Sequence, residues 1–158
     1  MQLKWESGAG IIEINGTEYV LNQCHWHSPS EHTIDGERFA LELHMVHESL
    51  DGKIAVVGIL YKIGRPDSFL SSTVVGVVDP RNIKIGSRKY YRYLGSLTTP
   101  PCTENVVWTV VKKVRTVTKE QVQLLRVAVH DDSDTNARPL QPLNGRTVKL
   151  FIPEDKDD

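Results

Sequence analysis

Apolar and more polar residues alternate along much of the chain. This pattern is typical of β-strands that are buried on one face. It is clearest at residues 39–47 (FALELHMVH), where it places Phe39, Leu41 and Leu43 on one face of a strand. The run 54–61 (IAVVGILY) is apolar throughout, so the strand there is expected to be buried on both faces. Strands are predicted at residues 11–14, 17–27, 39–47, 54–61, 90–93 and 105–114.

Turns and one helix complete the predicted secondary structure. Asn15-Gly16 and Asp35-Gly36 each lie between extended runs, where such pairs favour tight hairpin turns. A helix is predicted from Thr118 to about Val129, because Thr118 and Gln121 form a capping box ahead of an apolar stripe. Residues 68–89 give weaker signals, and 73–78 fit either a strand or a loop packed on the core. Without repeats or linkers, residues 1–158 are expected to form one domain.

Three histidines are predicted to meet on one face of this β structure. Side chains alternate along a strand, so His25 and His27 point to one side while Cys24 and Trp26 point to the other. The turn at residues 35–36 brings His44 back alongside them. Three neutral imidazoles are the ligand set of a catalytic zinc site whose fourth position is left to water. The pattern leaves open a purely structural role for each histidine.

Composition and charge exclude several classes of partner. Acidic and basic residues are interspersed and the net charge is −1, so no nucleic-acid or anionic-membrane surface is predicted. The longest apolar run, 54–63, is too short to span a bilayer, and the first residues lack the features of a signal peptide. The two cysteines, Cys24 and Cys102, leave open both free thiols and a disulfide between them.

Three segments in collinear order carry a resemblance to a known family. They are residues 23–32 (QCHWHSPSEH), residues 42–47 (ELHMVH), and residues 95–102 (GSLTTPPC) followed by Trp108. Together they resemble the α-class carbonic anhydrases, and the sequence of residues 25–36 is similar to that of the plant members of this family. The resemblance implies a mainly β fold with a central, largely antiparallel twisted sheet and one clear helix in the C-terminal half. Residues 1–158 would then form a single, partial domain of this type.

The resemblance also implies a metal site. It assigns a Zn2+ ion to His25, His27 and His44. In the family, three further groups hold the ligand rings by hydrogen bonds, and they match Gln23 for His25, the backbone carbonyl of Asn136 for His27, and Glu42 for His44.

The implied activity is the reversible hydration of CO2 to bicarbonate and a proton through a zinc-bound hydroxide. Thr98 matches the residue that accepts a hydrogen bond from the hydroxide while donating its own hydroxyl hydrogen to Glu31. Thr99 would line the mouth of the site. The apolar wall that receives CO2 matches Val46, Val56, Leu97, Val106 and Trp108. Sulfonamides or inorganic anions are expected as inhibitors at the open zinc position.

The resemblance also implies structural roles for two further histidines and identifies parts of the family that have no match in this sequence. His32 and His47 match buried histidines that hydrogen-bond around the site, with Tyr93 as a neighbour. The N-terminal third of the family, which includes its proton-shuttling histidine and a cysteine partner for Cys102, has no counterpart before Met1. Slower, buffer-dependent turnover and uncovered strand edges are therefore expected. A non-catalytic storage or binding protein of the same fold is the alternative. The compartment stays open: the resemblance suggests a secreted or plastid-directed protein, but no targeting segment is seen in the sequence.

Overall fold

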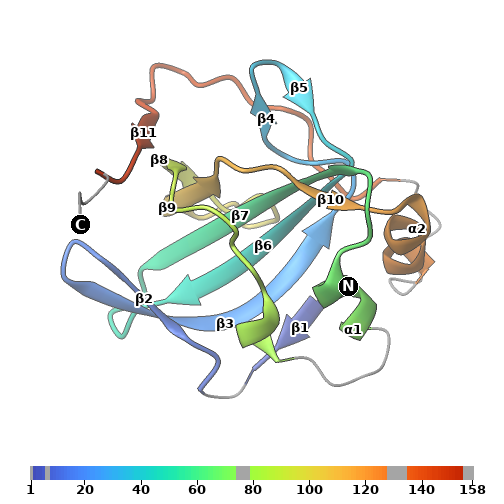
Figure 1. Ribbon diagram of the computed structural model, residues 1–158. Helices are drawn as coiled ribbons and strands as arrows, with labels where there is room; N and C mark the ends of the chain where they lie inside the picture. Colours follow the sequence, from blue (N-terminus) through green and yellow to red (C-terminus); the bar gives the residue numbers. More distant parts are fainter. Residues whose placement is uncertain (1, 6–7, 74–78, 128–134, 155–158) are drawn as a thin grey trace.

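The computed structural model describes residues 2–5, 8–73, 79–127 and 135–154 (Figure 1). In chain order its elements are β1 (Gln2–Lys4), β2 (Ile11–Ile14), β3 (Thr17–His27), β4 (Thr33–Ile34), β5 (Glu37–Arg38), β6 (Leu41–Glu48), β7 (Ile54–Ile63), α1 (Ser68–Thr73), the 3-10 turn η1 (Pro80–Asn82), β8 (Tyr90–Ser96), β9 (Glu104–Val111), β10 (Arg115–Val117), α2 (Lys119–Val127) and β11 (Lys149–Phe151). The prediction of a mainly β protein is confirmed.

One sheet of nine strands forms the centre of the molecule (Figure 1). Its order is β1-β3-β6-β7-β9-β8-β11, with β2 paired to β3 and β10 paired to β7. The β7–β9 and β7–β10 pairs are parallel and the other pairs are antiparallel, so the sheet is largely antiparallel as predicted. β4 and β5 form a separate ribbon around the turn Asp35-Gly36, where both residues have positive φ.

The two faces of the central strands differ in chemistry. One face packs into an apolar core together with side chains of α1 and α2, and burying each such side chain stabilises the fold by about 1.5–3 kcal/mol. This core includes Cys24, Trp26, Leu41, Leu43, Met45, Val57, Ile59, Tyr61, Phe69, Leu70, Val122 and Leu125. The opposite face of the same strands carries the histidines and Glu42, because side chains alternate along each strand.

A β-bulge in β3 determines which of its side chains face the apolar core and which face the opposite side. β3 has one residue more than β6 between the Leu21–His47 pair and the Gln23–Val46 pair. An extra residue reverses the alternation of the side chains that follow it. Leu21 and Cys24 consequently share the core face, and the histidines of β3 point to the other face.

The observed secondary structure departs from the prediction at β6 and at α1. β6 begins at Leu41, and Phe39, which lies before the strand, packs with Leu60 and Val110 rather than with Leu41. α1 was not predicted; the Asp67 carboxylate starts it by accepting hydrogen bonds from two backbone amides of its first turn. Residues 74–78 lie outside the described residues.

The structure also bears on the predicted helix, the cysteines and the membrane-spanning potential of the chain. The capping box at the start of α2 is present, since Thr118 and Gln121 exchange side-chain-to-backbone hydrogen bonds of 3.1 and 3.2 Å. Residues 128 and 129 of the predicted helix lie outside the described part. Cys24 is buried and Cys102 exposed, and both are free thiols. None of the helices in the described ranges is long and apolar enough to cross a membrane.

His47 lies on the core face rather than around the histidine group, contrary to the expectation from sequence. It is three residues after His44 and pairs with Leu21, so the alternation directs it to the core side. Its Nδ1 donates to the Met45 carbonyl at 3.0 Å. Burial lowers the pKa of His47 below its usual value of 6.5, and hydrogen bonds to the carbonyls of Met45 and Ala55 oppose this only in part.

We therefore expect metal-free protein to lose stability as the pH falls below 6.5, the usual histidine value. The unfolded chain takes up a proton at His47 there, whereas the folded chain does so only at lower pH, which favours unfolding by up to about 1.4 kcal/mol per pH unit. Urea unfolding with a chelator present, between about pH 7 and pH 5, measures this slope. His47→Gln keeps an N–H donor but does not titrate, so its free energy of unfolding should change less steeply with pH. Equal slopes in the two proteins would show that His47 is not responsible for the loss of stability.

Candidate metal centre

The pairing of β3 with β6 brings His25, His27 and His44 together. His25 is paired with His44 and His27 with Glu42. The centroids of the three rings lie 4.7 to 5.3 Å apart. One ring nitrogen of each histidine lies within 4.8 Å of a nitrogen of each of the other two. This geometry allows one ion to be held by all three rings.

The other nitrogen of each ring is held by an acceptor. His25 Nδ1 lies 2.8 Å from Gln23 Oε1 and His27 Nδ1 lies 3.1 Å from the Asn136 carbonyl oxygen. His44 Nε2 lies 2.7 Å from Glu42 Oε1. Each of these oxygens accepts, so the facing nitrogen carries the hydrogen and the remaining nitrogen has a free lone pair.

The free nitrogen of His27 is the clearest indication of a ligand. His27 is 4% exposed, and its Nε2 is buried without a hydrogen-bond partner among the described residues. Burial, followed by the charges of His44 and His27, lowers the pKa of His25 to about 3, and burial lowers the pKa of His27 as well. These two imidazoles are therefore neutral near pH 7, the form in which histidine binds metal. The donor set fits a zinc ion.

Asn136 is fixed by its side chain as well as by its carbonyl. Its Oδ1 accepts from the Ser28 backbone N–H at 2.9 Å, and its Nδ2 donates to the Trp26 carbonyl at 2.9 Å. These bonds join the segment that follows α2 to the end of β3. They place the carbonyl that orients His27, and nothing in the sequence pattern indicated them.

Glu31 lies beside the group, but the expected hydrogen bond from Thr98 is not formed. Glu31 Oε1 accepts from the Arg138 backbone N–H at 2.9 Å, while Oε2 is buried without a hydrogen-bond partner in the described structure. Oε2 lies 3.9 Å from His44 Nδ1. Thr98 belongs to the loop after β8, whose backbone bonds, from Leu97 N to the Thr103 carbonyl and from Cys102 N to the Thr99 carbonyl, stay within the loop.

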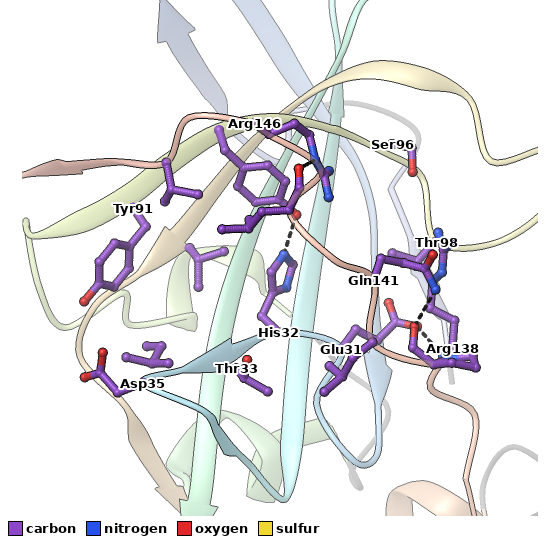
Figure 2. A pocket seen from close by; sticks show the side chains of 17 residues that line it. Glu31, His32, Thr33, Asp35, Tyr91, Ser96, Thr98, Arg138, Gln141 and Arg146 are labelled. Atoms are coloured by element: carbon purple, nitrogen blue, oxygen red, sulfur yellow. Dashed lines mark hydrogen bonds between the residues drawn. The ribbon is translucent and has the colours of Figure 1, made fainter.

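Thr98 and Glu31 nevertheless line the same cavity, which has a volume of about 560 Å3 (Figure 2). Figure 2 shows Glu31, Thr98, Arg138 and Gln141 gathered at one end of this cavity and Tyr91 at the other. The contact from Arg138 was missed by the sequence analysis, because a backbone N–H leaves no signature in the type of residue.

The predicted apolar wall is assembled as expected. Its members form one cluster, with Val56, Val106 and Trp108 buried and Val46 and Leu97 packed against them. The Trp108 ring lies 4.8 Å from the His44 ring, so this cluster adjoins the histidines. Thr99 is exposed in the loop after β8. The roles of these residues toward CO2 stay predictions.

Comparison with known proteins identifies the family. The family model for eukaryotic-type carbonic anhydrase matches residues 2–152. The chain belongs to this family. It is 62% identical to alpha carbonic anhydrase 7 of Arabidopsis thaliana over 168 residues, covering 97% of this chain and 61% of that protein. It is 49% identical to dioscorin dioA3 of Dioscorea japonica, covering 93% of this chain and 60% of that protein.

Solved structures of family members share the fold. Dioscorin complexed with ascorbate has a TM-score of 0.90 at 48% identity, covering 95% of this chain and 69% of that chain. The α-carbonic anhydrase of Thermovibrio ammonificans with sulfanilamide has a TM-score of 0.84 at 35% identity, covering 93% of this chain and 69% of that one. The chain spans about three-fifths of the length of the curated relatives that it matches, such as 61% of alpha carbonic anhydrase 7.

Gly58 on β7 leaves room for the carboxylate that holds His44. A methyl group at this position would lie 3.1 Å from Glu42 Oε1. We expect Gly58→Ala to displace this oxygen and to weaken Zn2+ binding by about tenfold, because outer contacts of ligands contribute on this scale. Competition with a chromophoric chelator measures the affinity.

Gly64→Ala is the matched control, since a methyl group there would lie 3.0 Å from Thr116 Cγ2, at the end of β7 and away from Glu42. It should lower the stability of the fold and leave the affinity for Zn2+ unchanged. Wild-type affinity in Gly58→Ala would show that the close approach to Glu42 is unimportant.

Proposed function

We propose that this protein binds Zn2+ through His25, His27 and His44 and catalyses the reversible hydration of CO2 to bicarbonate and a proton. The observation that carries the proposal is the buried, unpartnered Nε2 of His27 within a group of three oriented imidazoles. Membership of the carbonic anhydrase family supports the choice of reaction. Three neutral imidazoles with an open fourth position are the donor set of catalytic rather than structural zinc sites.

The chain's own residues would hold and orient the reactants. Bound zinc supplies a nucleophile at neutral pH by lowering the pKa of a coordinated water. Gln23, Asn136 and Glu42 keep the three rings in the tautomers that leave one lone pair each for the metal.

Thr98 and Glu31 are proposed to orient the nucleophile. The unfilled acceptor at Glu31 Oε2 supports this, because a buried carboxylate oxygen is costly without a donor. If the Thr98 hydroxyl donates to this oxygen when substrate binds, its own oxygen can only accept a hydrogen from the nucleophile. The nucleophile's lone pair is then directed at the carbon of CO2.

The apolar cluster beside His44 suits a substrate without net charge. Val46 and Leu97, which are only partly buried, would offer CO2 an apolar surface, and the buried Val56, Val106 and Trp108 support them from behind. Thr99 is proposed to line the entrance. Sulfonamides and small anions are proposed as inhibitors, and structures of relatives with sulfanilamide and with acetazolamide support this.

Binding without turnover is the second candidate function. It is favoured by the similarity to dioscorin, whose solved structure is a complex with ascorbate. A storage or binding protein of this kind needs no oriented nucleophile. A folded, zinc-loaded protein that binds ascorbate but does not hydrate CO2 would support this alternative.

Stopped-flow measurement of CO2 hydration tests the first proposal. We expect hydration that depends on one equivalent of Zn2+ and disappears in His44→Ala, because removing one imidazole of three destroys the ligand set. Measurements at several imidazole concentrations separate the reaction with CO2 from the release of the proton. Hydration equal to that of His44→Ala, in a folded sample that retains zinc, would exclude the proposed activity.

Two threonines of the loop after β8 offer a matched test of orientation. Thr98→Ala removes the hydroxyl that is proposed to donate to Glu31, and we expect kcat/KM for hydration to fall by about 100-fold, as for other losses of alignment. Thr103→Ala removes the same atoms from an exposed residue of the same loop that has no proposed role, and it should change kcat/KM less than about twofold. Equal effects of the two substitutions would contradict the role of Thr98.

A further inference from the structure

Glu42 is the most completely hydrogen-bonded side chain near the histidine group. It is fully buried, and its Oε2 accepts from the backbone N–H groups of Glu31 at 2.8 Å and of His32 at 2.9 Å. Its Oε1 lies 2.6 Å from His32 Nδ1 and 2.7 Å from His44 Nε2. Two imidazoles therefore share one carboxylate oxygen, and only one of them belongs to the proposed ligand set.

The positions of the hydrogens on the His32 and His44 rings follow from the role of Glu42 as an acceptor. Glu42 accepts two backbone N–H groups at Oε2, so both of its oxygens serve as carboxylate acceptors. Both facing nitrogens therefore carry hydrogens. His44 is left with a free lone pair on Nδ1, and this holds whether His32 is neutral or charged.

Tyr93 fixes the far side of the His32 ring. The Tyr93 hydroxyl lies 2.6 Å from His32 Nε2, a contact drawn as a dashed line from His32 in Figure 2. The Tyr93 ring is itself held, parallel to Trp108 at 6.3 Å and below the Arg146 guanidinium at 5.5 Å. A Cβ at Gly95 would lie 2.7 Å from the Tyr93 ring, so the glycine leaves the space that the ring occupies.

We propose that His32 and Tyr93 are positioning residues that act on the metal centre through Glu42. A carboxylate oxygen that already accepts from His32 is a weaker acceptor for His44, because each donor withdraws electron density from it. His32 thus limits how far Glu42 polarises His44, and Tyr93 keeps His32 in the orientation that does so. This inference rests on the proposed function of the same site.

The consequence of removing His32 has a definite sign. Without its N–H, Glu42 attracts the Nε2 hydrogen of His44 more strongly, and His44 becomes a more electron-rich ligand. A more electron-rich ligand set makes the metal a weaker acid. The pH midpoint of metal-dependent properties should therefore move upward, a shift that a purely structural role for His32 would not cause.

The test uses the full chain loaded with Co2+, whose visible spectrum reports the state of the site independently of turnover. We expect Tyr93→Phe to raise the pH midpoint of the spectrum, and of the hydration profile, by about 0.3 to 0.5 pH unit, roughly a two- to threefold change in proton affinity. His32→Leu should shift it further in the same direction. His32→Gln, whose amide N–H can still donate to Glu42, should restore the wild-type midpoint.

Tyr91→Phe is the matched control, because Tyr91 lies on the same strand and lines the same cavity but faces away from His32 in Figure 2. It should leave the midpoint unchanged. Unshifted midpoints in Tyr93→Phe would overturn the inference, and Tyr93→Phe decides the question if His32→Leu does not fold. A wild-type protein that shows the Co2+ spectrum but no hydration would overturn the proposed function alone, and one that binds no Co2+ would overturn both.

Discussion

The hydrogen-bond register between β3 and β6 is the constraint on which the rest of the site depends. It sets His25 opposite His44 and His27 opposite Glu42. A slip of one residue would turn every side chain of a strand to the other face and separate the three imidazoles. The bulge within β3 allows its first half to fill the core while its second half presents histidines. The apolar core on the far face fixes the register, because any slip would expose it to water.

A buried carboxylate is the second requirement of this arrangement. Glu42 has no exposure to solvent, and an unpaired charge in such a place would cost several kcal/mol. Two backbone amides and two imidazoles supply the compensation, so the orientation of His44 is tied to the backbone that follows β3. Gly58 contributes because it has no side chain: a Cβ at this position would lie 3.1 Å from Glu42 Oε1 and would crowd the carboxylate. The orientation of the histidine group therefore depends on the packing of the sheet around Glu42.

Sequence could predict the parts of this site that depend on periodicity. Alternation correctly placed His25, His27 and His44 on one face, but the turn at residues 35–36 joins β4 to β5 rather than the two histidine strands directly. The family resemblance supplied the partners of the three rings. The residue pattern itself does not reveal contacts made by backbone groups, such as the Arg138 N–H on Glu31, because any residue type offers them. Phe39 was assigned to the wrong face because alternation does not continue outside a strand. The position of the Thr98 loop depends on tertiary contacts that leave no local pattern.

The segment that follows α2 is the part of the site with the least support of its own. Residues 135–148 contain no helix or strand and are mostly exposed, yet they supply the carbonyl to His27 and the N–H to Glu31. Segments with few buried contacts open at lower free energy than the sheet on which they lie. A metal ion held by His27 would favour the state in which the Asn136 carbonyl orients that ring, so its binding energy would also stabilise this segment. The proposed metal binding would thereby be coupled to the order of residues 135–148, although the three proposed ligands all lie on two adjacent strands.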